Sequence, residues 1–572
     1  MPTLRVRWLD SLNARLRSSA IVPFTVLLFA VPALCDLLSS PAHASYRWIA
    51  GDTFYYLTVA RNFARHGVLA YDGVHGSNGF QPLWQLWSIV TEFLRERLGL
   101  GMHGLLLLTL SGLALIAGAI GLLGATLRRA RRLSVLFLFL PVGVYGLSVA
   151  PAWRVGFRPL IAHGNWDWLM PVFGTPWSYV NGMESALLLF FYALALYLAS
   201  KPESYWSVSH AAYFGLALAG ITLARLDHGF FSVALLLAYV LLCQRARPPI
   251  AANTPYEARL AEFARGLQLP IIAGLVSACC VVPYLLQNRY FYGNFVPLSG
   301  VAKSTFPRFS NDMLRYLTMM FDGRLRLDDD WWIQIACRVL QVVLPAVYCV
   351  IYLLIRAFRR TRSPLTTLLT ASAFGALVLS AYDFSFTPTI DQGYWYMPVS
   401  TLLPTLFLLN ARPFVIRESN RAQPLFAVAL TVTAIAFFFF GQRHLTYNHN
   451  YAATVLQNAV EARAHYRNQL PKVIEIDDGI VGYALDTPAH SSFLALDPRG
   501  FAARRQGHLL ELMLARGFDR VASATYRPPG TSDEQLATWL GGSLGQDVSQ
   551  YRVQREFVSA DGLLVIAKIT PR

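Results

Sequence analysis

The sequence predicts an all-α polytopic membrane bundle of about eleven transmembrane helices, followed by a small extracytoplasmic α/β domain. Three observations lead to this fold class. Of the 572 residues 55% are hydrophobic and only 14% are charged, whereas about a quarter of the residues of a soluble protein are charged. Apolar runs of about 20 residues, the length that crosses a bilayer, recur through the first 440 residues. Beyond residue 440 the charges return in a pattern of short apolar segments.

Eleven apolar runs are long enough to be membrane spans. They lie near 19–37, 103–127, 133–150, 183–200, 208–224, 228–243, 267–287, 333–356, 364–382, 395–411 and 423–440. With a cytoplasmic N-terminus, the inner connections hold 20 Lys and Arg and the outer ones hold 14, although the outer ones are about twice as long. This bias is the one expected of cytoplasmic loops. It places the C-terminus outside and explains the net charge of +16 without a nucleic-acid partner.

The chain divides at residue 440. Residues 1–440 form the transmembrane domain, with a first outer loop at 38–102, and residues 441–572 form the outer α/β domain. Strand-like runs at 472–477, 491–497 and 563–569 alternate there with a helical pattern at 508–517. Its acids include Glu475, Asp477, Asp478 and Asp486, and no nucleophile–base pair is recognisable among them. We therefore expect this domain to recognise the acceptor, at a distance from the chemistry.

The first outer loop contains a predicted helix over 52–65. Asp52 is in the N-cap position, apolar residues follow at helical spacing, and Gly67 ends the helix. A turn-rich stretch and an aromatic amphipathic segment then follow over 71–87, which is typical of an interfacial segment. Asp52 has two compatible interpretations. It caps the helix, and, among aromatic side chains at the membrane boundary, it is a candidate general base for an incoming hydroxyl.

Three ionisable residues stand at the outer ends of later spans. Glu184 begins one span, and Arg225 and Asp227 occupy a tight turn between two others. Ionisable groups at such depth normally face the bundle interior or a water-filled cavity. Contact with substrate and purely structural roles remain open alternatives. The structural roles are an Arg225–Asp227 ion pair and a helix-dipole contact for Glu184.

Lys303 is one of only four lysines among 49 cations. It follows a predicted span and precedes Ser304, so Lys303 and Ser304, together with Arg225, are candidates for binding a donor phosphate. A lysine extending to the lipid headgroups is the alternative for Lys303. His163 and Asp167 in the 151–182 loop, and Tyr396, are candidate sugar contacts. An interfacial aromatic belt explains these aromatic regions equally well.

The first loop resembles a known signature. The stretch GDTFYYLTVARNFARHGVLAYDGVHGSNGFQPLW is similar to the first-loop motif of bacterial membrane glycosyltransferases of the GT-C superfamily, the mannosyl- and arabinofuranosyltransferase-like enzymes. The later segments NGMES, LARLDHGF and PLSGVAKS, and IVGYALDTPAH at 480–490, resemble further motifs of the group in the same order. The similarity covers essentially the whole chain.

This resemblance implies a function. It implies transfer of a sugar from a polyprenyl-phosphate donor to a hydroxyl of a cell-envelope acceptor, outside the bacterial cytoplasmic (inner) membrane, with Asp52 as the catalytic base. Asn78, in the N-G turn of the motif, is a further candidate substrate contact. Many relatives have two adjacent acids where this chain has Gly51 and Asp52. We therefore expect no required cofactor, with a divalent cation as the alternative.

Two other classes of function compete with the transferase. A transporter or flippase of lipid-linked sugars also needs many spans and a polar interior, but its ionisable residues would lie near the bilayer centre, within inverted repeats. A catalytically inactive glycan-binding protein is the other alternative. Consumption of a lipid-linked donor in detergent separates the transferase from both.

Overall fold

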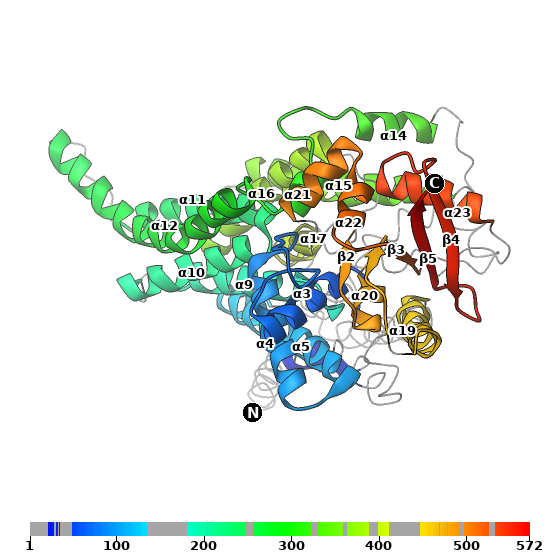
Figure 1. The fold of residues 1–572 in the computed structure, drawn as a ribbon. Helices are drawn as coiled ribbons and strands as arrows, with labels where there is room; N and C mark the ends of the chain where they lie inside the picture. The colour runs from blue at the N-terminus through cyan, green and yellow to red at the C-terminus, as the bar shows by residue number, and fades with distance from the viewer. Residues whose placement is uncertain are drawn as a thin grey trace, which may run out of the picture.

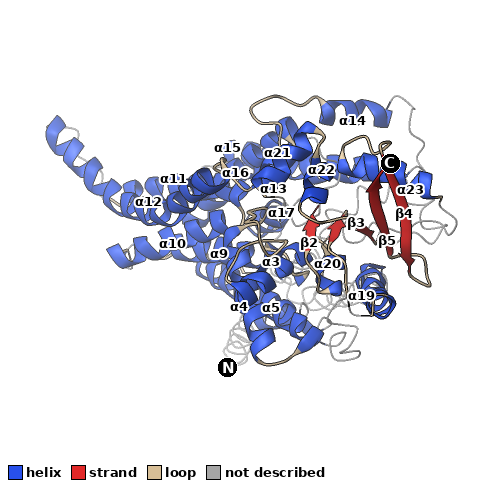
Figure 2. Cartoon of the chain, viewed as in Figure 1, coloured by secondary structure: helices blue, strands red, loops and turns tan. Residues whose placement is uncertain are grey.

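The structure is a computed structural model of the whole chain. It describes residues 49–133, 180–247, 255–321, 330–358, 363–387, 398–410, 447–476, 479–491, 497–524 and 532–572, with positions 203, 205 and 468 left out, together with Phe137 and parts of 21–34. The bundle lies on one side of the molecule and the β-sheet, with the C-terminus, on the other (Figures 1 and 2).

The first outer loop is built from two helices. They are α3 (Thr53–His66) and α4 (Pro82–Arg97), which pack on one another. The predicted helix and its end are confirmed, because the chain turns at Gly67 with φ +73°, a left-handed conformation that glycine adopts readily. Pro82 begins α4, where its missing N–H costs no helical hydrogen bond.

The bundle consists of long apolar helices. After the short turn η1 (Gly101–Gly104) they are α5 (Leu105–Arg129), α9 (Ser185–Ala199), α10 (Val208–Ala224), α11 (Gly229–Arg245), α12 (Tyr256–Tyr292), α15 (Asp330–Phe358), α16 (Pro364–Phe386) and α17 (Pro398–Asn410). The turn η6 (Leu226–His228) separates α10 from α11, while α13 (Leu298–Lys303) and α14 (Asp312–Phe321) follow α12. Within the bundle α5 packs on α9, α10 on α9 and α12, and α16 on α11 and α15.

Eight of the predicted spans coincide with these helices. The other three, at 19–37, 133–150 and 423–440, lie wholly or partly outside the described residues, so the number eleven stays a prediction. In the described chain, four helical segments are long and apolar enough to cross a membrane by length and composition, and four shorter apolar helices accompany them. The span expected at 267–287 is part of a longer helix, since α12 begins directly after Pro255.

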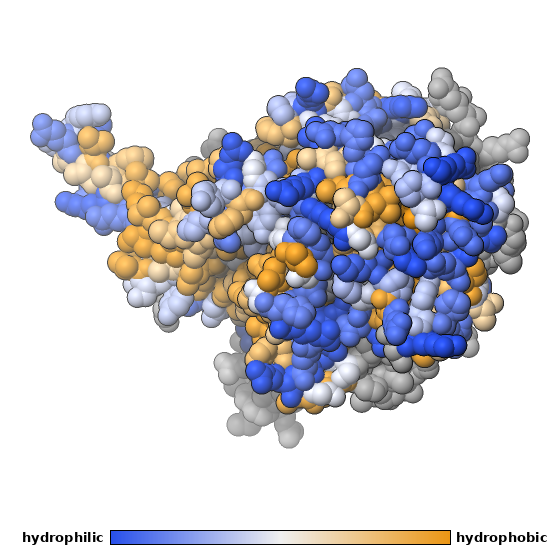
Figure 3. Space-filling view, viewed as in Figure 1, coloured by the Kyte–Doolittle hydropathy of each residue, from blue (hydrophilic) through white to orange (hydrophobic). Residues whose placement is uncertain are grey.

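The surface of the bundle is apolar. Figure 3 shows hydrophobic side chains gathered over α10, α11 and α12, between a hydrophilic tip of α12 and the hydrophilic half of the molecule that carries the sheet. Exposed side chains there include Tyr213, Val233, Leu237, Leu275 and Leu286. An apolar surface of this extent is unfavourable in water and suits contact with lipid.

The C-terminal residues form a five-stranded mixed sheet with helices. In chain order the elements are α19 (Tyr447–His465), β1 (Val473–Glu475), α20 (Ile480–Leu485), β2 (Ala489–Ser491), α21 (Pro498–Gln506), α22 (Leu509–Ala515), β3 (Arg520–Ser523), α23 (Asp533–Leu544), β4 (Tyr551–Val558) and β5 (Val565–Pro571). The strand order is β2-β1-β3-β5-β4. β1 pairs in parallel with β2 and β3, whereas β5 is antiparallel to β3 and β4.

One predicted strand lies mostly outside the described residues. The run at 491–497 was expected to be a strand, but its residues 492–496 are not described; β2 covers Ala489–Ser491, and Asp497 caps α21 by accepting from the backbone N–H groups of Arg499 and Gly500. Pro498 at the first helical position favours this helix start. The run at 472–477 contains β1, the run at 563–569 overlaps most of β5, and the helix predicted at 508–517 contains α22, so these predictions are confirmed.

The two faces of β1 belong to different cores. Ile474 packs with α22 and α23 in a core of the C-terminal residues. Val473 belongs to the large core that also contains Phe54, Tyr71 and the bundle helices. Because side chains alternate along a strand, β1 joins the two cores. The sheet is therefore packed directly against the first outer loop.

Candidate functional site

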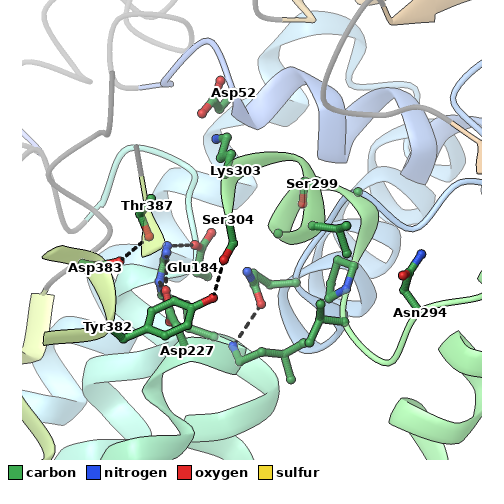
Figure 4. Close-up of a pocket in the computed structure, with 18 of the residues that line it drawn as sticks. Asp52, Glu184, Asp227, Asn294, Ser299, Lys303, Ser304, Tyr382, Asp383 and Thr387 are labelled. Carbon is green, nitrogen blue, oxygen red and sulfur yellow. Dashed lines mark hydrogen bonds and ion pairs between the residues drawn. The ribbon is translucent and has the colours of Figure 1, made fainter. Parts of the chain in front are cut away.

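A cavity of about 480 Å³ lies at the end of the bundle that faces the first outer loop. Its walls come from the start of α3, the turn before α4, the start of α9, the α10–α11 turn, the segment around α13 and the end of α16. Six acidic or basic side chains line it, namely Asp52, Glu184, Arg225, Asp227, Lys303 and Asp383. All of them except Arg225 are labelled in Figure 4. Five of the six were predicted from the sequence, and Asp383 was missed.

Asp52 lies directly before α3 and lines the cavity. Its side chain makes no capping hydrogen bond, so the predicted N-cap position is confirmed but the capping contact is not. The start of the helix is held from outside, because the carbonyl of Asn181 accepts from the N–H of Ala50 at 2.8 Å and from Oγ1 of Thr53 at 3.1 Å. The carboxylate of Asp52 is thus presented to the cavity.

Arg225 joins two of the carboxylates. Its Nη1 donates to Oε1 of Glu184 at 2.6 Å, and its Nε and Nη2 donate to the carboxylate of Asp227 at 2.8–3.2 Å. Arg225 and Glu184 are almost completely buried. The ion pair and the position on the cavity wall, two alternatives from the sequence, therefore occur together. Buried charges need such pairing, because each would otherwise lose its hydration without compensation.

His228 extends this cluster and was missed by the sequence analysis. Its Nδ1 lies 2.7 Å from Oδ1 of Asp227, and its ring stacks on Phe231 with centroids 5.3 Å apart. Asp227 thus contacts a guanidinium and an imidazole at once. The adjacency of Asp227 and His228 in the LARLDHGF motif was the signal that could have identified this contact.

Gln81 and Tyr56 connect the first loop to the cluster. The hydroxyl of Tyr56 accepts from the N–H of Gln81 at 3.1 Å and donates to Oε2 of Glu184 at 3.3 Å. Oε1 of Gln81 accepts from the N–H of Leu226 at 3.1 Å. Sequence reasoning treated this stretch only as a turn before an aromatic segment. In the fold it closes over the α10–α11 turn.

Lys303 is the last residue of α13, and Ser304 follows it. The hydroxyls of Ser304 and Tyr382 lie 2.9 Å apart, and the N–H of Thr305 donates to the carbonyl of Phe386 at 2.8 Å. This segment is therefore fixed to the end of α16, which also brings Tyr382 and Asp383 to the cavity. The side chain of Asp383 accepts from Oγ1 of Thr387 at 3.1 Å.

The remaining predicted residues lie elsewhere. Asn78 is buried outside the cavity lining, where its Nδ2 donates to Oδ1 of Asn288 at 3.3 Å and its Oδ1 accepts from the N–H of Leu298 at 3.3 Å. It joins the first loop to α12 and α13. His163, Asp167 and Tyr396 lie outside the described residues. Among the residues that the structure describes, no group of three or more His, Cys, Asp or Glu is placed to hold a metal ion.

Comparison with known proteins finds similarity among solved structures. No protein-family model and no curated protein matches the sequence. Among solved structures, the crystal structure of ArnT from Cupriavidus metallidurans in the apo state is similar with a TM-score of 0.46 and 14% sequence identity, over 95% of this chain and 97% of that one. A similarity of this extent assigns no residue a role.

Proposed function

We propose that this protein is an integral-membrane glycosyltransferase that moves a sugar from a polyprenyl-phosphate donor to a hydroxyl of an envelope acceptor. The observation that carries the proposal is one cavity at the bundle end, in which Asp52, Glu184, Arg225, Asp227 and Lys303 converge. These five residues come from four separate motifs, and the fold brings them to one space.

Asp52 is proposed as the general base. In the transfer, the bond between the anomeric carbon and the phosphate oxygen breaks, and a bond from that carbon to the acceptor oxygen forms. The proton of the acceptor hydroxyl goes to the carboxylate of Asp52, and the electron pair of the broken bond leaves with the polyprenyl phosphate. A carboxylate that lines the cavity and makes no capping hydrogen bond at the start of its helix is suited to this role.

Lys303 and Ser304 are proposed to bind the donor phosphate. An ammonium group and a hydroxyl stabilise a phosphate oxygen whose charge increases as the bond breaks. Arg225 lines the same cavity, but its guanidinium already bridges two carboxylates. Its positive charge near the phosphate site is therefore offset by these partners, and its main effect is to orient Glu184 and Asp227. Those two acids are suited to accept hydrogen bonds from sugar hydroxyls.

The cavity has an apolar side that fits a lipid-linked donor. Val296 and Phe306 line it and are exposed, on the segment that follows the long lipid-facing helix α12. A polyprenyl chain can lie along such a surface while its phosphate enters the polar part. A divalent cation at the carboxylates remains the alternative to a metal-free reaction. The sugar, whether of the mannosyl or the arabinofuranosyl type, is left open.

We place the site on the outer face of the bacterial cytoplasmic membrane. The chain segments that carry the basic residues, after α5, α9, α11 and α15, leave the bundle at the ends opposite the cavity. By the positive-inside bias those ends are cytoplasmic. The position of the ionisable cluster at the end of the bundle also favours a transferase over a transporter, which needs such groups near the midplane.

The test is consumption of a lipid-linked donor. Purified protein in detergent is incubated with a panel of radiolabelled undecaprenyl-phosphate sugars, with and without EDTA, and released undecaprenyl phosphate is measured. A transferase or a slow donor hydrolase releases it, whereas a flippase or a binding protein leaves every donor intact. Loss of the activity with EDTA would show that the divalent cation is required.

A further inference from the structure

Residues 479–486, from the outer domain, pack against the first turns of α3. They include α20 and the glycine before it, and they are separated from α3 by more than 400 residues in the sequence. From the sequence, the acids of this region were expected to lie on a domain away from the site. Of these acids, Glu475 and Asp486 contact the first loop but do not line the cavity, so the expectation about the chemistry stays a prediction. Asp477 and Asp478 lie outside the described residues.

Gly479 makes the closest approach. A Cβ atom at this position would lie 2.8 Å from the backbone N of Tyr55 and 3.0 Å from the carbonyl carbon of Phe54. Its φ of +86° is also a conformation that favours glycine. The backbone of the outer domain therefore touches the backbone of α3 three residues after Asp52. Only a residue without a side chain permits this contact.

Side chains of α3, α4 and residues 479–486 surround this contact. The ring of Tyr483 meets that of Phe54 edge to face at 5.3 Å, and its hydroxyl donates to Oε1 of Glu92 on α4 at 3.1 Å. Arg61, buried on α3, donates to the carbonyl of Tyr483 at 2.8 Å and lies 3.0 Å from Oδ1 of Asp486. The carbonyls at the end of α20 are thus satisfied by a residue of α3.

A buried carboxylate fixes the other side of the loop. Oε1 of Glu475 accepts from the N–H of Val481 at 2.7 Å, and its Oε2 accepts from the hydroxyl of Tyr71. The ring of Tyr71 packs on Tyr55, whose side chain lines the cavity. A continuous series of contacts therefore runs from the end of β1 to the cavity wall.

We propose that residues 479–486 are positioning residues of the active site, which hold the first turn of α3 and thereby the carboxylate of Asp52. The inference rests on the proposed function, because it takes Asp52 to be the base. The physical reason is that Asp52 does not cap its own helix, so its position depends on what fixes the helix start. Asn181 supplies one contact and Gly479 supplies the other. The outer domain is then required for the chemistry, in addition to any role in acceptor recognition.

The test compares two glycine substitutions in the full-length protein. Gly479→Ala places a methyl group against the backbone of α3. Gly507→Ala is the matched control, because Gly507 has a similar φ of +74° in the same domain but has no atom within 4 Å of the added Cβ. Both variants carry the left-handed strain, and only the first displaces α3.

Two readouts are needed. With an undecaprenyl-phosphate sugar that the wild type consumes, Gly479→Ala is expected to lower kcat by about 100-fold with donor KM nearly unchanged, because a displacement of about 1 Å can cost this much. Hydrogen exchange of the peptide that covers residues 53–58 should become faster in Gly479→Ala. Gly507→Ala should match the wild type in both measurements.

The outcomes separate the inference from the proposed function. Wild-type kcat and wild-type exchange in a folded Gly479→Ala protein would overturn the positioning role. If the wild type consumed no donor, the proposed function would fail, and hydrogen exchange would still show whether Gly479 holds α3. Should Gly479→Ala not insert, Phe54→Leu, which removes the ring contact with Tyr483, should lower kcat by about tenfold at unchanged KM. An unchanged kcat in folded Phe54→Leu protein would also overturn the positioning role.

Discussion

Nη1 of Arg225 lies 2.6 Å from Oε1 of Glu184, and both side chains are buried at the end of the bundle. The two residues belong to different helical segments, and the same guanidinium also binds Asp227. The contact therefore fixes the relative position of α9 and the α10–α11 turn. It also places three charges on the wall of one cavity.

Removing Arg225 alone should destabilise the protein strongly. Arg225→Met leaves two carboxylates without their cation, and breaking such a buried pair costs about 3–5 kcal/mol. The melting temperature in detergent should fall, while Arg308→Ala, on an exposed loop, should leave it nearly unchanged. Adding Glu184→Leu and Asp227→Leu to Arg225→Met should restore much of the lost stability without restoring turnover. If Arg225→Met alone were as stable as the wild type, charge pairing would not be what holds this cluster together.

Asp52→Asn should abolish most of the chemistry and leave donor binding intact. The amide keeps the shape of the side chain but cannot accept a proton, so turnover should fall by about 10²–10⁴-fold. Asp533→Asn, at an exposed surface ion pair with Arg555, is the matched control and should retain activity. Near-normal turnover in folded Asp52→Asn protein would remove Asp52 from the mechanism and make Glu184 or Asp227 the next candidate base.

Lys303→Ala should have a different kinetic signature. The lysine is proposed to contact the phosphate before and during bond cleavage, so its loss should raise the donor KM and lower kcat together. Lys201→Ala removes a lysine at the opposite end of the bundle, after α9, and should change neither constant. An unchanged donor KM in Lys303→Ala would exclude Lys303 from the phosphate site.

The stability of the outer domain should depend on the ionisation of Asp497. Burial would raise the pKa of this carboxyl, but its contacts with His490, Arg516 and the backbone of α21 hold the pKa well below its usual range. A lowered pKa contributes stability above the unfolded value of about 3.9, and this contribution is lost as the pH falls. The difference in free energy of unfolding between wild type and Asp497→Asn should therefore be constant above about pH 5 and shrink below about pH 4. A difference that stays constant down to pH 3 would contradict this assignment.

The C-terminus should be extracytoplasmic. A fluorescent protein that folds only in the cytoplasm, fused after Arg572, should remain dark because the predicted topology exports it. The same fusion placed at 248–254, between Arg247 and α12 in the predicted cytoplasmic connection, should fluoresce. A bright C-terminal fusion would show that one span has been miscounted, with 80–94 as the first segment to re-examine.

The sequence alone determined the local features of this protein. Eight apolar helices at predicted spans, the helix that follows Asp52 and its end at Gly67 were predicted correctly, because hydropathy over 20 residues and the φ preference of glycine act within a short stretch of chain. The order of four motifs also identified five of the six ionisable residues around the cavity. Strands β1 and β5 were found by their apolar runs.

Only the tertiary structure decided how these features meet. Gln81 contacts the backbone of Leu226 only because the fold brings these two segments together, and the ring of His228 contacts Asp227 in the turn between α10 and α11. Asp383 lines the cavity because the end of α16 lies there. The parallel pairing of β1 with β3 and the docking of Gly479 on α3 join residues tens to hundreds of positions apart. Such contacts depend on the packing of whole helices and sheets, for which a single sequence contains no local signal. The site is therefore encoded in scattered motifs, and its geometry is set by packing between distant parts of the chain.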